Sequence, residues 1–152
     1  MHQAAGPCAG PQPGVPGIRN QSSRPLRPPS GGTPPPDRLQ VGDELIFLAP
    51  VAHDAALRHE AAFPDEVARY GPAGRDWCVH DLQYVLSWAC LDASDPGVLD
   101  RQVAWLARLL AARDYDVRRL ARSLELLADA LVERHPRANG LAQRLRAVAA
   151  NV

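Results

Sequence analysis

Two histidine–aspartate dipeptides, His53-Asp54 and His80-Asp81, are the residues of this sequence whose types and spacing most directly suggest chemistry. Imidazole nitrogen and carboxylate oxygen are both ligands of divalent ions that activate water for hydrolysis. Neighbouring side chains on a helix point about 100° apart, so each dipeptide directs only one of its two members at a given site. A half-buried histidine that hydrogen-bonds a backbone or carboxylate group is the simpler alternative for His80.

The order of these residues is similar to the His…His-Asp…Asp order of all-helical metal-dependent phosphohydrolases. In this sequence that order is met by His53, His80, Asp81 and Asp129. The resemblance implies a divalent ion held by side chains from separate helices, and a phosphohydrolase activity. Other catalytic patterns do not occur. The chain has no Gly-x-Ser-x-Gly turn, and all 17 of its basic residues are arginine, which excludes lysine-dependent chemistry.

A stripe of aromatic residues on the most apolar predicted helix, residues 73–92, is the second candidate site. Its rings fall on one face of the helix at about 100° per residue, and Trp105 on the predicted helix at 97–113 is their expected aromatic partner. These rings either pack in the core or form the wall of a pocket. A pocket would take polar contacts from His80 and Asp81, because ligand sites in bundles are mostly apolar with a few convergent polar groups. The candidate ligand-binding residues are therefore Trp77, His80, Asp81, Tyr84, Trp88 and Trp105.

A group of arginines surrounds the expected turn between the fourth and fifth helices. Its members are Arg113, Arg118, Arg119 and Arg122. Guanidinium groups bind carboxylates and phosphates through paired hydrogen bonds, so the group could dock an acidic or phosphorylated partner. Asp114, Asp116 and Glu125 are interleaved with the arginines, however, and exposed ion pairs of about 0–1 kcal/mol each are the alternative interpretation.

Helical periodicity runs through most of the chain from residue 41 onward and predicts the elements that position these side chains. The clearest case is an apolar seam at steps of three and four, formed by Val117, Leu120, Leu124, Leu127 and Leu131. The apolar run at 45–48 has no evident alternating partner, so no strand is expected. The predicted helices cover about 43–60, 64–70, 73–92, 97–113 and 116–134, with a sixth around Leu141, Leu145 and Val148. The expected fold is all-α, an antiparallel helical bundle over residues 41–152.

Residues 1–40 have a different composition and are expected to form a disordered leader. They hold 10 of the 15 prolines and 6 of the 11 glycines, and such a segment buries too little apolar surface to offset its ordering entropy. The run Pro34-Pro35-Pro36 could serve as a polyproline II ligand, although a solvated segment is the simpler reading. The leader has no apolar signal-peptide region, and nothing in the chain matches a membrane span, which predicts a cytoplasmic protein without membrane contact. Zero net charge argues against nucleic-acid binding.

One longer pattern suggests a biological setting. Residues 70–88 and 103–110 are similar to a helical domain of bacterial signalling and stress-regulatory proteins, with the motifs YG..GR..C..D and V.WL..LL..R. The resemblance implies a regulatory context and assigns no active site. The expected function is a non-enzymatic regulatory or protein-interaction module that senses a small ligand in an aromatic-lined core. It would act with a protein partner or as a homo-oligomer and without cofactor or metal, and the phosphohydrolase remains the alternative.

Overall fold

The computed structural model describes residues 34–152, and this part of the chain forms six α-helices and a two-stranded antiparallel hairpin. The elements are β1 (Arg38–Val41), β2 (Glu44–Phe47), α1 (Leu48–Ala62), α2 (Pro64–Tyr70), α3 (Pro72–Asp92), α4 (Val98–Ala111), α5 (Val117–Arg134), the short 3-10 helix η2 (Pro136–Ala138) and α6 (Asn139–Ala149). The all-α class and the helical bundle are confirmed. Within the described range, no helix combines the length and apolar character needed to cross a membrane.

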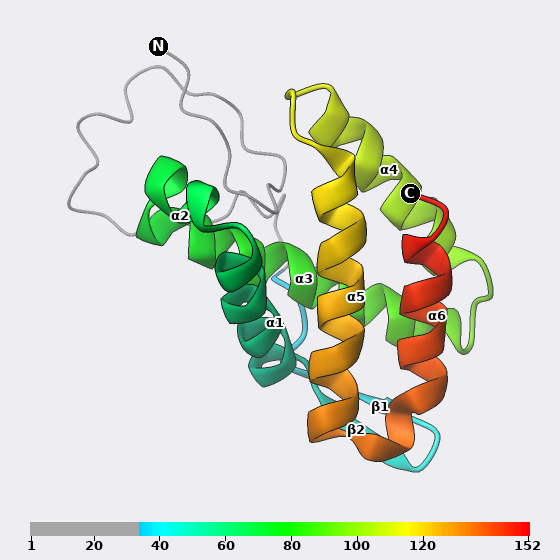
Figure 1. Cartoon of the computed structure of the whole chain (residues 1–152). Coiled ribbons are helices and arrows are strands. Elements are labelled where there is room, and N and C mark those ends of the chain that lie inside the picture. The colour runs from blue at the N-terminus through cyan, green and yellow to red at the C-terminus, as the bar shows by residue number, and fades with distance from the viewer. Residues whose placement is uncertain (1–33) are drawn as a thin grey trace.

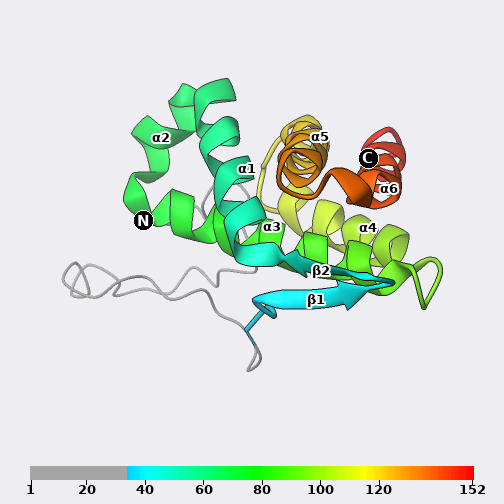
Figure 2. The ribbon, with the colours of Figure 1, turned by 90° about the horizontal axis from the view of Figure 1, so that it is seen from below.

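The helices form two layers (Figures 1 and 2). Helices α1, α5 and α6 lie in one layer, with α5 packed against both of its neighbours. Helices α3 and α4 form the second layer, and the hairpin lies against α3 at the edge of the molecule. Helix α3 contacts α1, α2, α4, α5, α6 and β1. The most apolar helix of the sequence is therefore the central one.

The core is built around the leucine seam of α5. Leu124, Leu127 and Leu131 have no exposed surface, as the spacing of three and four predicts. Helix α1 meets this seam and α3 with Val51 and a set of buried alanines, Ala52, Ala55 and Ala56. Because alanine side chains are short, the backbone of α1 can approach both neighbouring helices closely.

The hairpin of β1 and β2 shows that the expectation of no strand around residues 45–48 is wrong. Arg38 pairs with Phe47 and Val41 pairs with Glu44. Gly42 at the turn has a φ of +57°, a left-handed conformation that glycine adopts readily. The prediction that the first helix starts near residue 43 is wrong, because β2 occupies that segment. Pro50 neither bends nor breaks α1: it lies in the first turn, where the amide that proline lacks has no helical partner.

The folded part of the chain begins before residue 41. Strand β1 crosses the boundary expected between residues 40 and 41, and the Leu48 amide donates to the Asp37 carbonyl over 2.8 Å. The Gln83 side chain on α3 donates to the Pro36 carbonyl over 2.9 Å. Part of the proline run is thus held by the protein's own central helix. Residues 1–33 of the expected leader lie outside the described residues.

His135 fastens the hairpin to the end of α5. The Phe47 amide donates to His135 Nε2 over 3.3 Å, so that nitrogen carries no proton in this arrangement. His135 Nδ1 is then the protonated nitrogen and donates to Glu44 Oε1 over 3.1 Å. The two contacts fix the imidazole tautomer and connect β2 to a helix 88 residues away in the sequence.

Stability measurements can test this assignment of the core. Replacing Leu127 with alanine is expected to lower the free energy of unfolding by about 2–5 kcal/mol, because the fully buried side chain leaves a cavity in the seam. Replacing Trp105, which is 42% exposed, is expected to cost about 1 kcal/mol or less. Urea unfolding of both variants measures the two values. A greater loss for Trp105→Ala than for Leu127→Ala would contradict the assignment.

Candidate functional site

The aromatic stripe predicted on α3 forms a continuous row of ring contacts. The Trp77 and His80 ring centroids are 6.0 Å apart in an edge-on arrangement, and those of His80 and Tyr84 are 4.9 Å apart. Tyr84 and Trp88 continue the row at 6.1 Å. Trp77 is buried, whereas Tyr84 and Trp88 are half-buried. We refer to Trp77, His80, Tyr84 and Trp88 as the α3 row.

The structure does not bring Trp105 to the α3 row. The buried residues of α4 are Leu99, Val103, Leu106 and Leu110. Position 105 falls outside this stripe, and the Trp105 side chain is 42% exposed. Trp105 is therefore a surface residue, and the expected pairing of its ring with the central helix is wrong.

Beside the α3 row, three buried polar atoms have no hydrogen-bond partner among residues 34–152. They are Trp77 Nε1, His80 Nε2 and Asp81 Oδ2. His80 Nδ1 lies 3.3 Å from Asp81 Oδ1, so the two residues make one contact and leave their other polar atoms unused. Burial lowers the pKa of His80. Burial raises the pKa of Asp81 well above its usual value, and the nearby Arg113 charge opposes this shift only in part.

The four residues of the metal-ion alternative lie apart. His53 is exposed on α1, and Asp129 on α5 is paired with Arg146 of α6 over 3.0 Å. His80 and Asp81 contact each other on α3. Across residues 34–152, no three His, Cys, Asp or Glu side chains come together in a group suited to a metal ion. The structure thus offers no support for the phosphohydrolase alternative.

The arginine group is divided among separate ion pairs rather than gathered into one cationic surface. Arg118 pairs with Asp116, which also caps α5 by accepting from the Arg118 amide. Arg122 pairs with Glu125 over 2.8 Å. These contacts match the ion-pair interpretation. Arg119 behaves differently because it turns inward toward α2, and Arg113 lies near Asp81.

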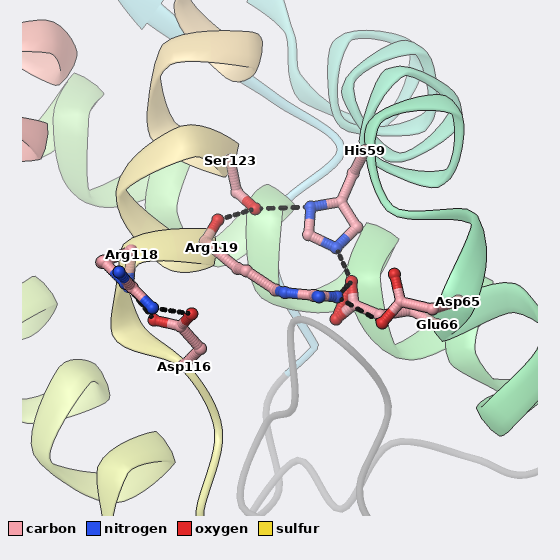
Figure 3. Close-up of polar contacts among 7 residues, drawn as sticks. All are labelled: His59, Asp65, Glu66, Asp116, Arg118, Arg119 and Ser123. Atoms are coloured by element: carbon pink, nitrogen blue, oxygen red, sulfur yellow. Dashed lines mark hydrogen bonds and ion pairs between the residues drawn. The ribbon is translucent and has the colours of Figure 1, made fainter.

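The sequence analysis missed a buried polar cluster between α1, α2 and α5 (Figure 3). His59 Nε2 lies 2.5 Å from Glu66 Oε2, and His59 Nδ1 lies 2.7 Å from Ser123 Oγ. All three residues are buried, with 0%, 4% and 1% of their surface exposed for His59, Glu66 and Ser123. Arg119 reaches the same place, with Nη1 at 2.9 Å from Asp65 Oδ2 and 3.6 Å from Glu66 Oε2.

This cluster contains the residue types of a serine–histidine–acid catalytic relay, but its hydrogen bonds run the wrong way for one. The Ser123 hydroxyl donates to the Arg119 carbonyl over 2.8 Å. Since a hydroxyl has one hydrogen, Ser123 must accept from His59 Nδ1, which is then protonated and cannot remove the serine proton. The cluster acts as a clamp that joins three helices.

Helix α2 depends on this clamp. Glu66 is the one buried residue of α2, and Val67 is 44% exposed. The guanidinium of Arg119 also lies over the Phe63 ring at 4.6 Å, directly before α2 begins. The burial of Tyr115 and the nearby negative charge of Glu66 raise the tyrosine pKa. Helix α2 is thus attached mainly by charged and polar contacts.

Comparisons with known proteins give no independent guide to the site: no family model, curated protein or solved structure matches the chain. The likeness to helical domains of bacterial regulatory proteins therefore stays a prediction. The missed residues did carry a signal in the sequence. His59 continues the apolar stripe of α1 after Ala52, Ala55 and Ala56, and Ser123 interrupts the leucine seam of α5.

Removing the buried acid should release α2. Breaking a buried charge pair costs about 3–5 kcal/mol, so Glu66→Ala should speed hydrogen exchange of the α2 amides by about a hundredfold or more, up to the limit of free exchange. Asp65→Ala removes the exposed acid that binds the same arginine, and should change exchange by about fivefold or less. Hydrogen-exchange mass spectrometry measures both variants. Equal effects of the two substitutions would refute the clamp.

The burial of Asp81 should give the protein a characteristic pH dependence. An acid whose pKa is raised in the folded protein binds more protons in the folded state than in the unfolded state. The protein with Asp81 therefore loses stability as pH rises above about 4. The amide that replaces the carboxyl group in Asp81→Asn does not ionise. The stability of the variant relative to wild type should therefore increase between about pH 4 and pH 7, as measured by urea unfolding. His80 is present in both proteins, so the comparison isolates Asp81. A stability difference between the two proteins that does not change with pH would show that Asp81 is not desolvated.

Proposed function

We propose that the protein is a non-enzymatic regulatory or interaction module that binds a small polar ligand at the α3 row. The observation that carries the proposal is the set of three unpartnered atoms, Trp77 Nε1, His80 Nε2 and Asp81 Oδ2. Buried polar groups are nearly always hydrogen-bonded, and each unsatisfied one costs about 1–3 kcal/mol. Three such atoms within little more than one helical turn are explained if a ligand supplies their partners.

The chemistry of the three atoms describes the ligand. The indole nitrogen of Trp77 can only donate, so the ligand must present a hydrogen-bond acceptor. His80 Nδ1 lies 3.3 Å from Asp81 Oδ1, and when Nδ1 donates this hydrogen bond, Nε2 of the neutral ring is an acceptor that requires a donor. Tyr84 offers the next ring of the row. A small, flat molecule that carries both a donor and an acceptor fits these requirements.

Helix α3 is well placed to transmit the effect of binding. It contacts five other helices and β1, so a ligand that shifts α3 changes the packing of the whole bundle. A ligand that favours one helix arrangement shifts the population toward it in proportion to its differential affinity. This is the regulatory mechanism that we propose, with a protein partner or a second copy of the chain as the receiver of the change.

The sequence supports the same setting. The motifs over residues 70–88 and 103–110 resemble helical domains of bacterial signalling and stress-regulatory proteins. A cytoplasmic location is part of the proposal. Nothing in it depends on a metal ion or a covalent step.

Native mass spectrometry tests the proposal directly. The full chain is incubated with a small-molecule cell extract, separated from unbound material and weighed intact. We expect a bound small molecule in the wild type that is absent from Asp81→Leu, because leucine removes the carboxyl group of the site and places an apolar side chain there. The control is Asp76→Leu, which alters an exposed acid of the same helix and should retain the ligand.

Two outcomes would overturn this function. One is the same adduct, or no adduct, in all three proteins. The other is a crystal structure of the extract-treated chain in which ordered water alone satisfies Trp77 Nε1, His80 Nε2 and Asp81 Oδ2.

A further inference from the structure

A cavity of about 340 Å³ lies between the hairpin, the C-terminal end of α3 and the start of α6. It is separate from the three unpartnered atoms, which belong to the N-terminal half of α3. Its volume falls at the lower end of the range for small-molecule sites, about 300–1,000 Å³. Its apolar lining is formed by Val41, Ile46, Ala89 and Leu141.

The inner wall of the cavity is apolar. Ile46 has no exposed surface, and Ala89 is 1% exposed. Val41 and Leu141 are partly buried and pack against the same core. A hydrocarbon group in the cavity would therefore cover the partly exposed apolar surface of Val41 and Leu141 and displace water from it.

The charged side chains at the rim have polar partners, with one exception. Arg144 bridges Asp92 and Asp100 at 3.0 and 2.7 Å, and Glu44 pairs with His135. Arg137 is the charged cavity residue for which the described part of the chain provides no ion pair. Because His135 is neutral in this arrangement, Glu44 keeps its charge, and the four charged lining residues together carry no net charge. Arg137 is the guanidinium at the rim whose hydrogen-bond donors remain available to a ligand.

The backbone amides beside Arg137 also favour a negatively charged group. The N-cap residue of α6 is Ala138, whose side chain accepts no hydrogen bond from the first amides of the helix, and the first residues of α6 lie at the cavity. The amide groups of a helix N-terminus favour an anion. This effect adds to the charge of Arg137 and does not replace it.

We propose that this cavity binds a small molecule with an apolar body and a single carboxylate. The hydrocarbon part lies against Val41, Ile46 and Leu141, and the carboxylate pairs with Arg137 at the rim. The proposal does not rest on the function assigned to the α3 row, since it uses other residues.

Gly140 allows the cavity to be filled without disturbing the fold. A Cβ atom at Gly140 meets no other atom within 4 Å, and glycine is less favourable than alanine inside a helix. Gly140→Ala and Gly140→Leu should both fold at least as stably as the wild type. Gly140 lines the cavity, so alanine adds a single methyl group there, whereas leucine adds a larger side chain that narrows the space.

The probes are octanoate, octanol and octylamine, titrated into the full chain below the concentration at which they form micelles and followed by calorimetry. A hydrogen bond to a charged group contributes about 1.5–3 kcal/mol, so octanoate should bind about ten- to a hundredfold more tightly than octanol. Arg137→Ala should remove this preference and leave folding unchanged. Gly140→Ala should bind octanoate like the wild type, and Gly140→Leu should bind it more weakly.

Each contrary result counts against a defined part of the proposal. Failure of octanoate to bind, or unchanged binding to Gly140→Leu, would show that the cavity is not a ligand site. Equal affinity for octanoate and octanol, or tighter binding of octylamine, would show that a carboxylate is not the preferred head group. Loss of octanoate binding in Asp81→Leu, with binding intact in Gly140→Leu, would move the site to the α3 row.

Discussion

Burial of the leucine seam of α5 is the interaction on which the other features of the molecule depend. The seam fixes α5 between α1 and α6. His59 lies one turn beyond Ala55 and Ala56 on α1, and Ser123 lies next to Leu124, so the packing that buries the seam also brings these polar residues together. Hydrophobic burial supplies the driving force, and the polar cluster specifies how α2 joins the bundle.

The sequence predicts those parts of the fold that depend on local periodicity. The limits of α2 follow from Pro64 at its start and Gly71 at its end, and Asp116 caps α5. The hairpin escaped prediction because each strand has four residues, too few for a clear alternation, and because Leu39 and Val41 follow a proline-rich segment. Short strands depend on tertiary contacts that a local pattern does not contain.

The candidate sites also differ in whether local periodicity predicts them. The α3 row lies on a single helix, so helical geometry alone places its rings together. The His59–Glu66–Ser123 cluster joins three helices and could not be assembled before their packing was known. Its sequence signal was a polar residue within each apolar stripe. Trp105 illustrates the opposite error, since its residue type suggested the core while the stripe at Leu99, Val103, Leu106 and Leu110 excluded it.

The single buried side chain of α2 has a thermodynamic consequence. Both urea sensitivity and the heat-capacity change of an opening reaction grow with the surface that becomes exposed, and the heat-capacity term is positive for apolar surface. Detachment of a helix that buries only Glu66 exposes little such surface. The equilibrium between attached and detached α2 therefore depends little on urea and has an enthalpy that changes little with temperature, whereas unfolding of the leucine seam depends steeply on urea and has a large heat-capacity change. The molecule therefore combines one cooperative core with one helix whose detachment responds much less to urea than the unfolding of that core.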